Sequence, residues 1–400
     1  MLQLEDFKEA KRRVDEVILQ TPLIYSQSFS DECGNQVYIK PENLQKTGAF
    51  KIRGAYNKIS KLPDAAKRKG LIASSAGNHA QGVAYAAKQQ GVAATIVMPA
   101  GTPLIKVNAT KALGAKVILY GEVYDEAYQK ACELQKEQDL TFIHPFDDED
   151  VIEGQGTIAL EILEELPDAD AILVPIGGGG LISGIAACAK AINPNIQVIG
   201  VEPEGAASAE AAVKEDKICL LQEVNTIADG TAVKQIGVKP FDYIRRYVDD
   251  IILVNDYELM EAFLLLVEKH KLVAEGSGIL ALAATKKLGF KDKKVVALVS
   301  GGNIDVLTIS SMINKGLISR GRIFSFSIQL PDKPGQLELV SHVLNELNAN
   351  VIGVEHNQFK NFARFSEVEL RVTCETSGEE HIEQIIKRFN DLGYEIVKVN

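Results

Sequence analysis

Four consecutive glycines, Gly177 to Gly180, follow the apolar run AILVPI and precede a helix-like segment that begins LISG. Glycines let the backbone approach an anion closely, and the free N–H groups at a helix start attract negative charge. The pattern therefore predicts a phosphate-binding loop. A tight turn that needs positive φ values is the structural alternative, but such a turn rarely needs four glycines in a row.

The kind of phosphate compound is less clear from these residues. A dinucleotide fold uses GxGxxG, with an acidic residue about 20 positions further on. Counted from Gly178, the third glycine is replaced by Ser183, although Glu202 does end the next expected strand. A dinucleotide site stays open as an alternative, whereas the absence of GxxxxGK[ST] excludes a nucleotide triphosphatase P-loop.

Two further polar loops follow apolar runs, SSAGNH at 74–79 and SGGN at 300–303. Hydroxyls, an amide and helix-start N–H groups suit a carboxylate or a cofactor oxygen, although the first loop could equally serve only as a helix cap. Open α/β sheets bind ligands at the carboxyl ends of their strands, where all three polar loops are expected. The sequence therefore predicts one shared ligand site.

Two lysines, Lys46 and Lys51, lie in the segment ENLQKTGAFKIRGA among several small residues. A desolvated lysine amine is a nucleophile, whereas most lysines are solvated surface residues. The residue types alone do not choose between the two lysines.

The elements that must position these loops alternate short apolar runs with helix-like stretches from about residue 71, and again from residue 171. This alternation predicts β-α-β units with parallel sheets buried on both faces. We expect an α/β catalytic region at 1–320 made of two lobes, with a smaller lobe at roughly 45–150 inserted in the larger one.

The pattern changes at Arg322. The run FSFSIQL alternates apolar and polar residues with a period of two, which indicates an antiparallel strand. Helix patterns and further strands, expected at 351–356 and 364–374, complete a β-α-β-β-α-β order typical of ferredoxin-like domains. We expect this separate domain at 323–400, joined by a linker at 318–322.

Composition narrows the partners. With 43 basic and 54 acidic residues the formal net charge is −11, so nucleic acids and anionic membranes are poor candidates. The five cysteines show no CxxC pair, which is typical of reduced thiols in a cytoplasm, and the amino terminus is unlike a signal peptide. Cys and His spacing predicts no transition-metal site. A small-molecule ligand or a protein is the expected partner.

Five segments, in order, resemble the threonine dehydratase family of pyridoxal-phosphate enzymes: PENLQKTGAFKIRGA, SSAGNHAQGVA, PIGGGGLISG, ADGTAVK and VSGGN. The resemblance covers nearly the whole chain and implies the tryptophan-synthase-β type of fold, known as fold type II, with pyridoxal 5′-phosphate as cofactor. It also implies that the last domain is an ACT-like regulatory module.

Residue roles follow from this resemblance. The lysine that binds the cofactor covalently falls on Lys51, next to Phe50, and the partner of the pyridine nitrogen falls on Ser300. Asn78 would lie beside the pyridoxal 3′-oxygen. The phosphate loop would be Gly177, Gly178, Gly179, Gly180 and Leu181, and the substrate carboxylate would be held by Ser75, Asn78 and His79.

The implied activity is β-elimination of L-threonine to 2-oxobutanoate and ammonia, with L-serine as a slower substrate. A lysine amine with a lowered pKa can take the Cα proton, the ring is the electron sink, and the cofactor phosphate is the expected proton donor to the leaving hydroxyl. A hydroxyl such as Ser300 would not keep the pyridine nitrogen protonated, which favours prompt elimination.

Related serine racemases carry a second catalytic serine where this chain has Ala76, so racemisation should be minor. A β-replacing synthase is a further rival, and a non-catalytic dinucleotide sensor is the alternative outside enzymes.

Two ancillary sites are also expected. Some relatives bind a cation after the strand that ends in Glu202; here the carbonyl of Ala206 and the hydroxyl of Ser208 would join that carboxylate, which suits a monovalent ion or none. In the last domain, Asp332 and Gly335 lie in a turn, PDKPGQL, that could bind an amino-acid effector such as isoleucine or valine, or the domain could serve only subunit association. The family resemblance implies a homo-oligomer, a tetramer, and a biosynthetic (isoleucine) or catabolic setting.

Overall fold

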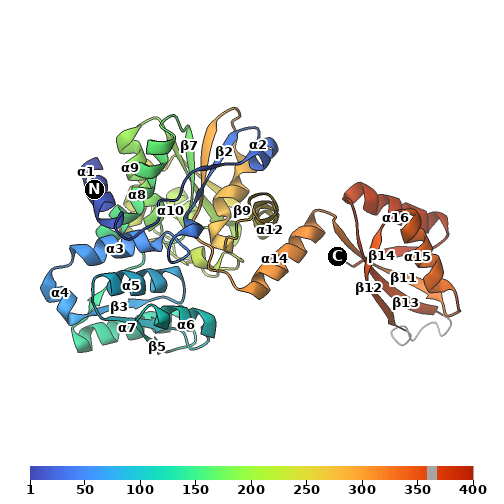
Figure 1. The fold of residues 1–400 in the computed structure, drawn as a ribbon, viewed down its shortest axis with the longest axis horizontal. Coiled ribbons are helices and arrows are strands. Elements are labelled where there is room, and N and C mark those ends of the chain that lie inside the picture. Colours follow the sequence, from blue (N-terminus) through green and yellow to red (C-terminus); the bar gives the residue numbers. More distant parts are fainter. Residues whose placement is uncertain (358–366, 400) are drawn as a thin grey trace. The chain divides into compact units, whose positions relative to one another are not determined.

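The computed structural model describes residues 1–357 and 367–399, and it divides into two compact units, Met1–Ile304 and Asp305–Asn400 (Figure 1). The division precedes helix α14 (Val306–Ser319), whereas the sequence pattern indicated a linker at 318–322. Only Met312 and Gly316 of α14 are buried, so the burial pattern of this helix does not show to which unit it belongs.

The larger sheet of the first unit has six strands in the order β1-β2-β10-β7-β8-β9. All neighbouring pairs are parallel except the antiparallel pair β1 and β2. The expected strand AILVPI forms β7, which is buried along its whole length. The strands are β1 (Ile24–Tyr25), β2 (Gln36–Pro41), β7 (Ala171–Pro175), β8 (Gln197–Pro203), β9 (Asp250–Val254) and β10 (Lys294–Val299).

The smaller sheet has four parallel strands in the order β5-β4-β3-β6. Figure 1 shows these strands together with α4 to α7 in the blue-to-teal part of the chain. The predicted α/β architecture with two parallel sheets is therefore confirmed. The elements are α4 (Asp64–Lys69), β3 (Leu71–Ser74), α5 (Asn78–Gln89), β4 (Ala94–Met98), α6 (Leu104–Ala112), β5 (Lys116–Leu119), α7 (Tyr124–Gln138) and β6 (Thr141–Phe142).

The remaining helices of the first unit include α8, which is buried from residue 151 to residue 163 and packs against α3 and α9. Short 3-10 turns and one π-helical turn, Leu266–His270, complete the unit. The helices are α1 (Leu4–Val14), α2 (Gln27–Cys33), α3 (Lys51–Lys61), α8 (Glu149–Glu165), α9 (Gly180–Ile192), α10 (Ser208–Lys214), α11 (Val238–Tyr247), α12 (Asp256–Leu265) and α13 (Leu280–Ala283).

A buried cluster of four charged side chains ties α3 to α8 and β2. Arg53 donates from Nε and Nη2 to the two carboxylate oxygens of Glu42, at 2.8 and 2.9 Å, and from Nη1 to Glu161 at 2.6 Å. Lys40 donates to Glu161 at 2.6 Å. Burial by itself lowers the pKa of Arg53, but the two carboxylates outweigh burial and the pKa is raised, so the guanidinium stays charged.

The second unit contains the expected β-α-β-β-α-β order after α14, with an antiparallel sheet ordered β12-β13-β11-β14. One face of β11 packs Phe324, Phe326, Ile328 and Leu330 into the core. Residues 364–366 of the expected strand 364–374 lie outside the described residues, as does residue 400. The elements are β11 (Ile323–Pro331), α15 (Gln336–Glu346), β12 (Asn350–Asn357), β13 (Glu367–Glu375), α16 (Glu379–Asp391) and β14 (Ile396–Lys398).

Within residues 1–357 and 367–399, no helix combines the length and the apolar character needed to cross a lipid bilayer. The same residues contain no cluster of three His, Cys, Asp or Glu side chains suited to a metal ion. All five cysteines are unpaired thiols.

Candidate active site

Lys51 is the first residue of α3, and its amine is buried. Its Nζ atom donates a hydrogen bond to the carbonyl oxygen of Pro145 at 2.9 Å and lies 5.2 Å from the centre of the Phe50 ring. Burial lowers the pKa of Lys51 to about 8, although the nearby Glu275 carboxylate raises it. Lys46 is exposed by contrast, so the structure makes Lys51 the desolvated lysine of the pair.

The segment before Lys51 pairs with the loop that follows β10. The backbone N–H of Phe50 donates to the carbonyl oxygen of Ser300 at 3.1 Å, and Ala49 forms an antiparallel bridge with Gly301. The Ser300 side chain is buried, and its Oγ lies 3.5 Å from the carbonyl oxygen of Ser277. Ser300 and Lys51, which are 249 positions apart in the sequence, therefore lie on adjacent segments.

Asn78, at the start of α5, contacts Glu275 and also Asn303 of the loop that follows β10. Its Nδ2 donates to Oε1 of Glu275 at 2.5 Å, and its Oδ1 accepts from Nδ2 of Asn303 at 2.8 Å. Burial raises the pKa of Glu275 to about 7, and Asp229 adds to the rise, whereas Asn78, Lys106 and Lys51 oppose it. Sequence reasoning missed Glu275, because an acidic residue in KLVAEGSG belongs to no recognisable motif.

Ser75 and His79, in the loop at 74–79, are placed differently from one another. Ser75 is half-buried, and its Oγ accepts from the N–H of Gly77 at 3.2 Å. His79 is buried, with Nε2 2.9 Å from the carbonyl oxygen of Ile143. Because a carbonyl only accepts, Nε2 carries the proton. Burial lowers the pKa of His79 to about 3, with a further contribution from the Lys51 cation, so the imidazole is neutral at physiological pH.

The glycine loop lies between β7 and α9. Gly179 has a φ of 91° and precedes the first turn of α9, which no side chain caps within the described residues. A Cβ atom on Gly178 would lie 2.3 Å from the Phe146 ring, and one on Gly177 would lie 3.0 Å from Cα of Thr231. Glycine at 177 and 178 thus allows close packing, and glycine at 179 allows the positive φ. The uncapped helix start that follows, at Gly180 and Leu181, is a suitable site for a phosphate.

Glu202 is the last residue but one of β8 and is completely buried. Its two carboxylate oxygens accept from the N–H groups of Ala209 at 2.8 Å and Glu210 at 2.9 Å, and burial raises its pKa to about 7. A carboxylate enclosed in this way has no access to a ribose, which removes the support for the dinucleotide alternative. Nearby, the buried Oγ of Ser208 has no hydrogen-bond partner within the described residues, and Ala206 is buried beside it in sequence.

These features define a fold-type-II site, and the comparisons agree with that class. Residues 14–301 match the model of the family described as pyridoxal-phosphate dependent enzyme, and the chain belongs to that family. The buried lysine and the uncapped glycine-led helix start fit this cofactor, because it needs an amine and a phosphate site.

Similarity to individual proteins extends beyond residues 14–301. The chain is 46% identical over 397 residues to an L-threonine ammonia-lyase of Thermotoga maritima, which covers 99% of both chains. It is 44% identical over 396 residues to one of Geobacter sulfurreducens, covering 98% of both. A catabolic L-threonine dehydratase of Escherichia coli is 44% identical over 313 residues, which are 77% of this chain and 95% of that protein.

Solved structures give the same picture for the first unit's fold. The processed form of threonine deaminase isoform 2 from Solanum lycopersicum superposes with a TM-score of 0.75 at 40% identity, covering 78% of this chain and 93% of that one. Maize serine racemase also gives a TM-score of 0.75, at 38% identity, covering 79% and 98%. Similarity of fold therefore extends to both lyases and racemases.

Proposed function

We propose that this protein is an L-threonine ammonia-lyase, which eliminates the β-hydroxyl of L-threonine to give 2-oxobutanoate and ammonia and which also acts on L-serine. The observation that carries the proposal is the buried Lys51 amine, with a pKa of about 8, at the meeting point of the polar loops. Identity of 46% to an L-threonine ammonia-lyase over nearly the whole chain supports the choice of substrate.

Different residues of the site would hold different parts of the cofactor. Lys51 would bind it covalently beside Phe50, and the helix start at Gly177, Gly178, Gly179, Gly180 and Leu181 would bind its phosphate. Asn78 would donate to its 3′-oxygen and Ser300 would face its pyridine nitrogen. When bound, pyridoxal phosphate supplies an electron sink for the carbanion formed at the substrate Cα.

Lys51 would also act as the general base. A pKa near 8 lies close to physiological pH, where a base is present in its neutral form and still accepts a proton effectively. The Pro145 carbonyl holds the amine on one side by a 2.9 Å hydrogen bond. The neutral hydroxyl of Ser300 does not hold a proton on a pyridine nitrogen as a carboxylate would, and this favours elimination over transamination.

The substrate carboxylate would be held by the start of α5. Gly77, the residue before this helix, provides no side-chain cap, so the N–H groups of Asn78 and His79 are available to an anion, together with the hydroxyl of Ser75. The His79 imidazole is neutral and donates to Ile143. We therefore assign the role of His79 to its backbone N–H.

Borohydride reduction of the holoenzyme followed by peptide mapping tests this function. A pyridoxyl group on Lys51, together with keto-acid formation from threonine faster than from serine, is the expected result. An enzyme that shows no visible cofactor absorbance and no modified Lys51 peptide would falsify the proposal. Formation of D-serine without keto acid would instead identify a racemase.

Similarity to maize serine racemase makes racemisation the second candidate. Racemisation needs an acid on the face of the substrate opposite Lys51, where the resemblance to racemases calls for a serine and this chain has Ala76. The methyl group of alanine cannot deliver a proton. This residue favours elimination.

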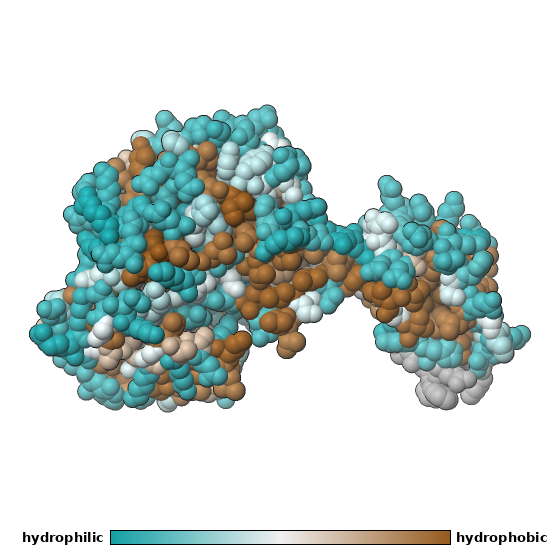
Figure 2. Space-filling model, viewed as in Figure 1, coloured by the Kyte–Doolittle hydropathy of each residue, from teal (hydrophilic) through white to brown (hydrophobic). Residues whose placement is uncertain are grey.

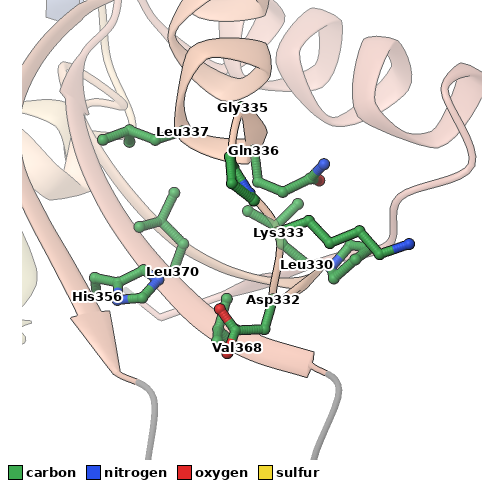
Figure 3. A pocket seen from close by; sticks show the side chains of 11 residues that line it. Leu330, Asp332, Lys333, Gly335, Gln336, Leu337, His356, Val368 and Leu370 are labelled. Carbon is green, nitrogen blue, oxygen red and sulfur yellow. The ribbon is translucent and has the colours of Figure 1, made fainter.

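For the second unit we propose an ACT-like regulatory domain that binds a free amino acid. A cavity of about 230 Å³ lies at the turn between β11 and α15 (Figure 3). Gly335, with a φ of 92°, precedes α15, which no described side chain caps, so the N–H groups at this helix start suit a carboxylate. Apolar side chains beside them suit an aliphatic effector such as isoleucine or valine: Leu330, Leu337, Val368 and Leu370.

A truncated chain that ends at Gly321 tests the regulatory role. The Escherichia coli relative matches only 77% of this chain, so a shorter enzyme of this kind is known to exist. Isoleucine or valine should change the threonine dependence of the full chain and leave that of the truncated chain unchanged. An equal response in both chains would place the effector elsewhere, and no response in either would leave subunit association as the role of the domain.

We propose a homo-oligomer, and from the family resemblance a tetramer. Helix α14 exposes Val306 and Leu307, which are 72% and 80% accessible, and Figure 2 shows apolar surface over this helix. A second copy of the chain would remove these side chains from water. Sedimentation velocity of the wild type and of Leu307→Lys tests this, because the charged variant should dissociate if α14 lies in the interface.

We also propose a cytoplasmic location, which the five unpaired cysteines support.

We further propose a monovalent cation bound by Glu202, the carbonyl of Ala206 and Ser208. The Ser208 hydroxyl, which has no hydrogen-bond partner among residues 1–357 and 367–399, supports the cation. Activity and melting temperature should fall when potassium is replaced by tetramethylammonium, and Ser208→Ala should remove this difference. Equal behaviour of the wild type in both salts would exclude the cation.

A further inference from the structure

A continuous chain of hydrogen bonds runs from the lysine segment to Glu275 through two asparagines. Asn303 donates from Nδ2 to the carbonyl oxygen of Thr47 at 2.7 Å and to Oδ1 of Asn78 at 2.8 Å. Asn78 in turn donates from Nδ2 to Oε1 of Glu275 at 2.5 Å. The chain joins four segments that are separate in sequence, at 47, 78, 275 and 303.

The direction of this chain is fixed at its Thr47 end. A backbone carbonyl can only accept, so Asn303 must direct its NH₂ group to Thr47, and the same group donates to Oδ1 of Asn78. The NH₂ group of Asn78 is then directed to Glu275. Rotation of the Asn78 amide by 180° would place its NH₂ against the NH₂ of Asn303, which is repulsive whatever the protonation state of Glu275, so one orientation of the amide is favoured.

Two glycines leave the space that the chain occupies. Gly48 has a φ of 71°, and a Cβ atom there would lie 2.4 Å from Oδ1 of Asn303. A Cβ atom on Gly301 would lie 2.4 Å from Oε1 of Glu275 and 3.1 Å from Nδ2 of Asn78. The glycines of KTGAF and SGGN thus allow the two asparagines and the glutamate to approach one another.

We propose that Glu275 and Asn303 are positioning residues that orient the Asn78 carboxamide, so that its second N–H is directed to the 3′-oxygen of the cofactor. That N–H has no partner within the described residues, whereas the other N–H and the oxygen are both engaged. The inference rests on the proposed function, because it takes the cofactor's place beside Asn78 from it. This positioning role of Asn303 and Glu275 is separate from the roles proposed for Lys51 and the phosphate loop.

Asn303→Asp is the most direct test, because it keeps the size of the side chain and turns its donor into an acceptor. It should weaken pyridoxal-phosphate binding by the cofactor-free protein about tenfold, the equivalent of one lost hydrogen bond, in a fluorescence titration. It should also shift the pH dependence of the visible absorbance of the bound cofactor. Asn195→Asp, at an exposed position, is the matched control and should change neither.

Substitution of Glu275 tests the same chain of hydrogen bonds at its other end. Glu275→Gln keeps an acceptor for Asn78 and should bind the cofactor within about threefold of wild type, whereas Glu275→Leu should behave like Asn303→Asp. If one variant fails to fold, as judged by the melting of the cofactor-free protein, the variant at the other end still decides.

A double-mutant cycle shows whether the effect passes through Asn78. Adding Asn303→Asp to Asn78→Ala should cause no further loss of cofactor affinity, because the amide that it orients is gone. An undiminished loss in that background, or wild-type affinity and absorbance in both Asn303→Asp and Glu275→Leu, overturns the inference. Failure of the wild type to bind pyridoxal phosphate would instead overturn the proposed function, so the two failures are distinguishable.

Discussion

The amine of Lys51 and the carbonyl of Pro145 are joined by a 2.9 Å hydrogen bond. This contact connects the start of α3 to the segment that follows β6 in the smaller sheet. The next residue, Phe146, lies against the glycine loop that leads into α9. The lysine, the smaller sheet and the expected phosphate site are therefore linked through two consecutive residues of one segment.

The low pKa of Lys51 predicts how fast the cofactor-free protein takes up pyridoxal phosphate at different pH values. Only the neutral amine attacks the aldehyde, so the rate should rise about tenfold per pH unit below pH 8 and level off above it. Stopped-flow absorbance measures this rate. Lys46→Ala should give the same profile, Lys51→Ala should bind no cofactor covalently, and a rate that still rises tenfold per unit at pH 9.5 would show an ordinary amine.

The buried cluster around Arg53 should be important for stability. Arg53→Met leaves the Glu42 carboxylate without its partner in the interior, and it should lower the free energy of unfolding by about 3 to 5 kcal/mol. Urea denaturation measures the loss. The double variant Arg53→Met, Glu42→Gln should recover part of it, because the unpaired charge is then removed.

Arg12 provides a matched control for that measurement. It pairs with Glu5 at 3.3 Å, but both side chains are mostly exposed, so Arg12→Met should leave the urea midpoint unchanged. Similar losses for Arg12→Met and Arg53→Met would mean that burial does not set the strength of these pairs.

Much of the site could be predicted from the sequence, because local patterns place it. A buried parallel strand followed by a polar, glycine-containing loop puts that loop at the carboxyl edge of a sheet, as found for the loops after β3, β7 and β10. The resemblance chose Lys51 over Lys46; in the structure Lys51 is desolvated and Lys46 is exposed. The order of elements in the second unit also followed from apolar periodicity.

The remainder depends on contacts between distant residues. Arg53 and Glu161 are charged residues at ordinary helix positions, and only the packing of α3 against α8 makes them a buried pair. Glu275 gives no sign of its burial, since its partner Asn78 is 197 positions away. The start of α14 was also missed as a boundary, because a helix pattern does not say which unit its helix belongs to.

The neutral, buried His79 predicts a loss of stability in mild acid. Its pKa is about 3 in the folded protein and 6.5 in the unfolded chain, so between these values the unfolded chain binds more protons and stability falls as pH falls. From pH 6.5 to 5 this group should contribute a loss of roughly 1 to 2 kcal/mol. His79→Gln should show a smaller loss over the same interval in urea denaturation, and an unchanged pH dependence would mean that the pKa of His79 is the same in the folded and the unfolded chain.

Ala76 predicts which reaction a single added hydroxyl should introduce. Ala76 is half-buried and lies two residues before Asn78, in the loop expected to hold the substrate carboxylate. Ala76→Ser would place a proton donor there, and D-serine formation from L-serine should rise above the wild-type level while keto acid is still formed, because Lys51 and Ser300 are untouched. Chiral chromatography measures both products. Ala76→Val, which adds volume without a hydroxyl, is the control and should form no D-serine; equal D-serine from both variants would show that altered shape, and not a new proton donor, is the cause.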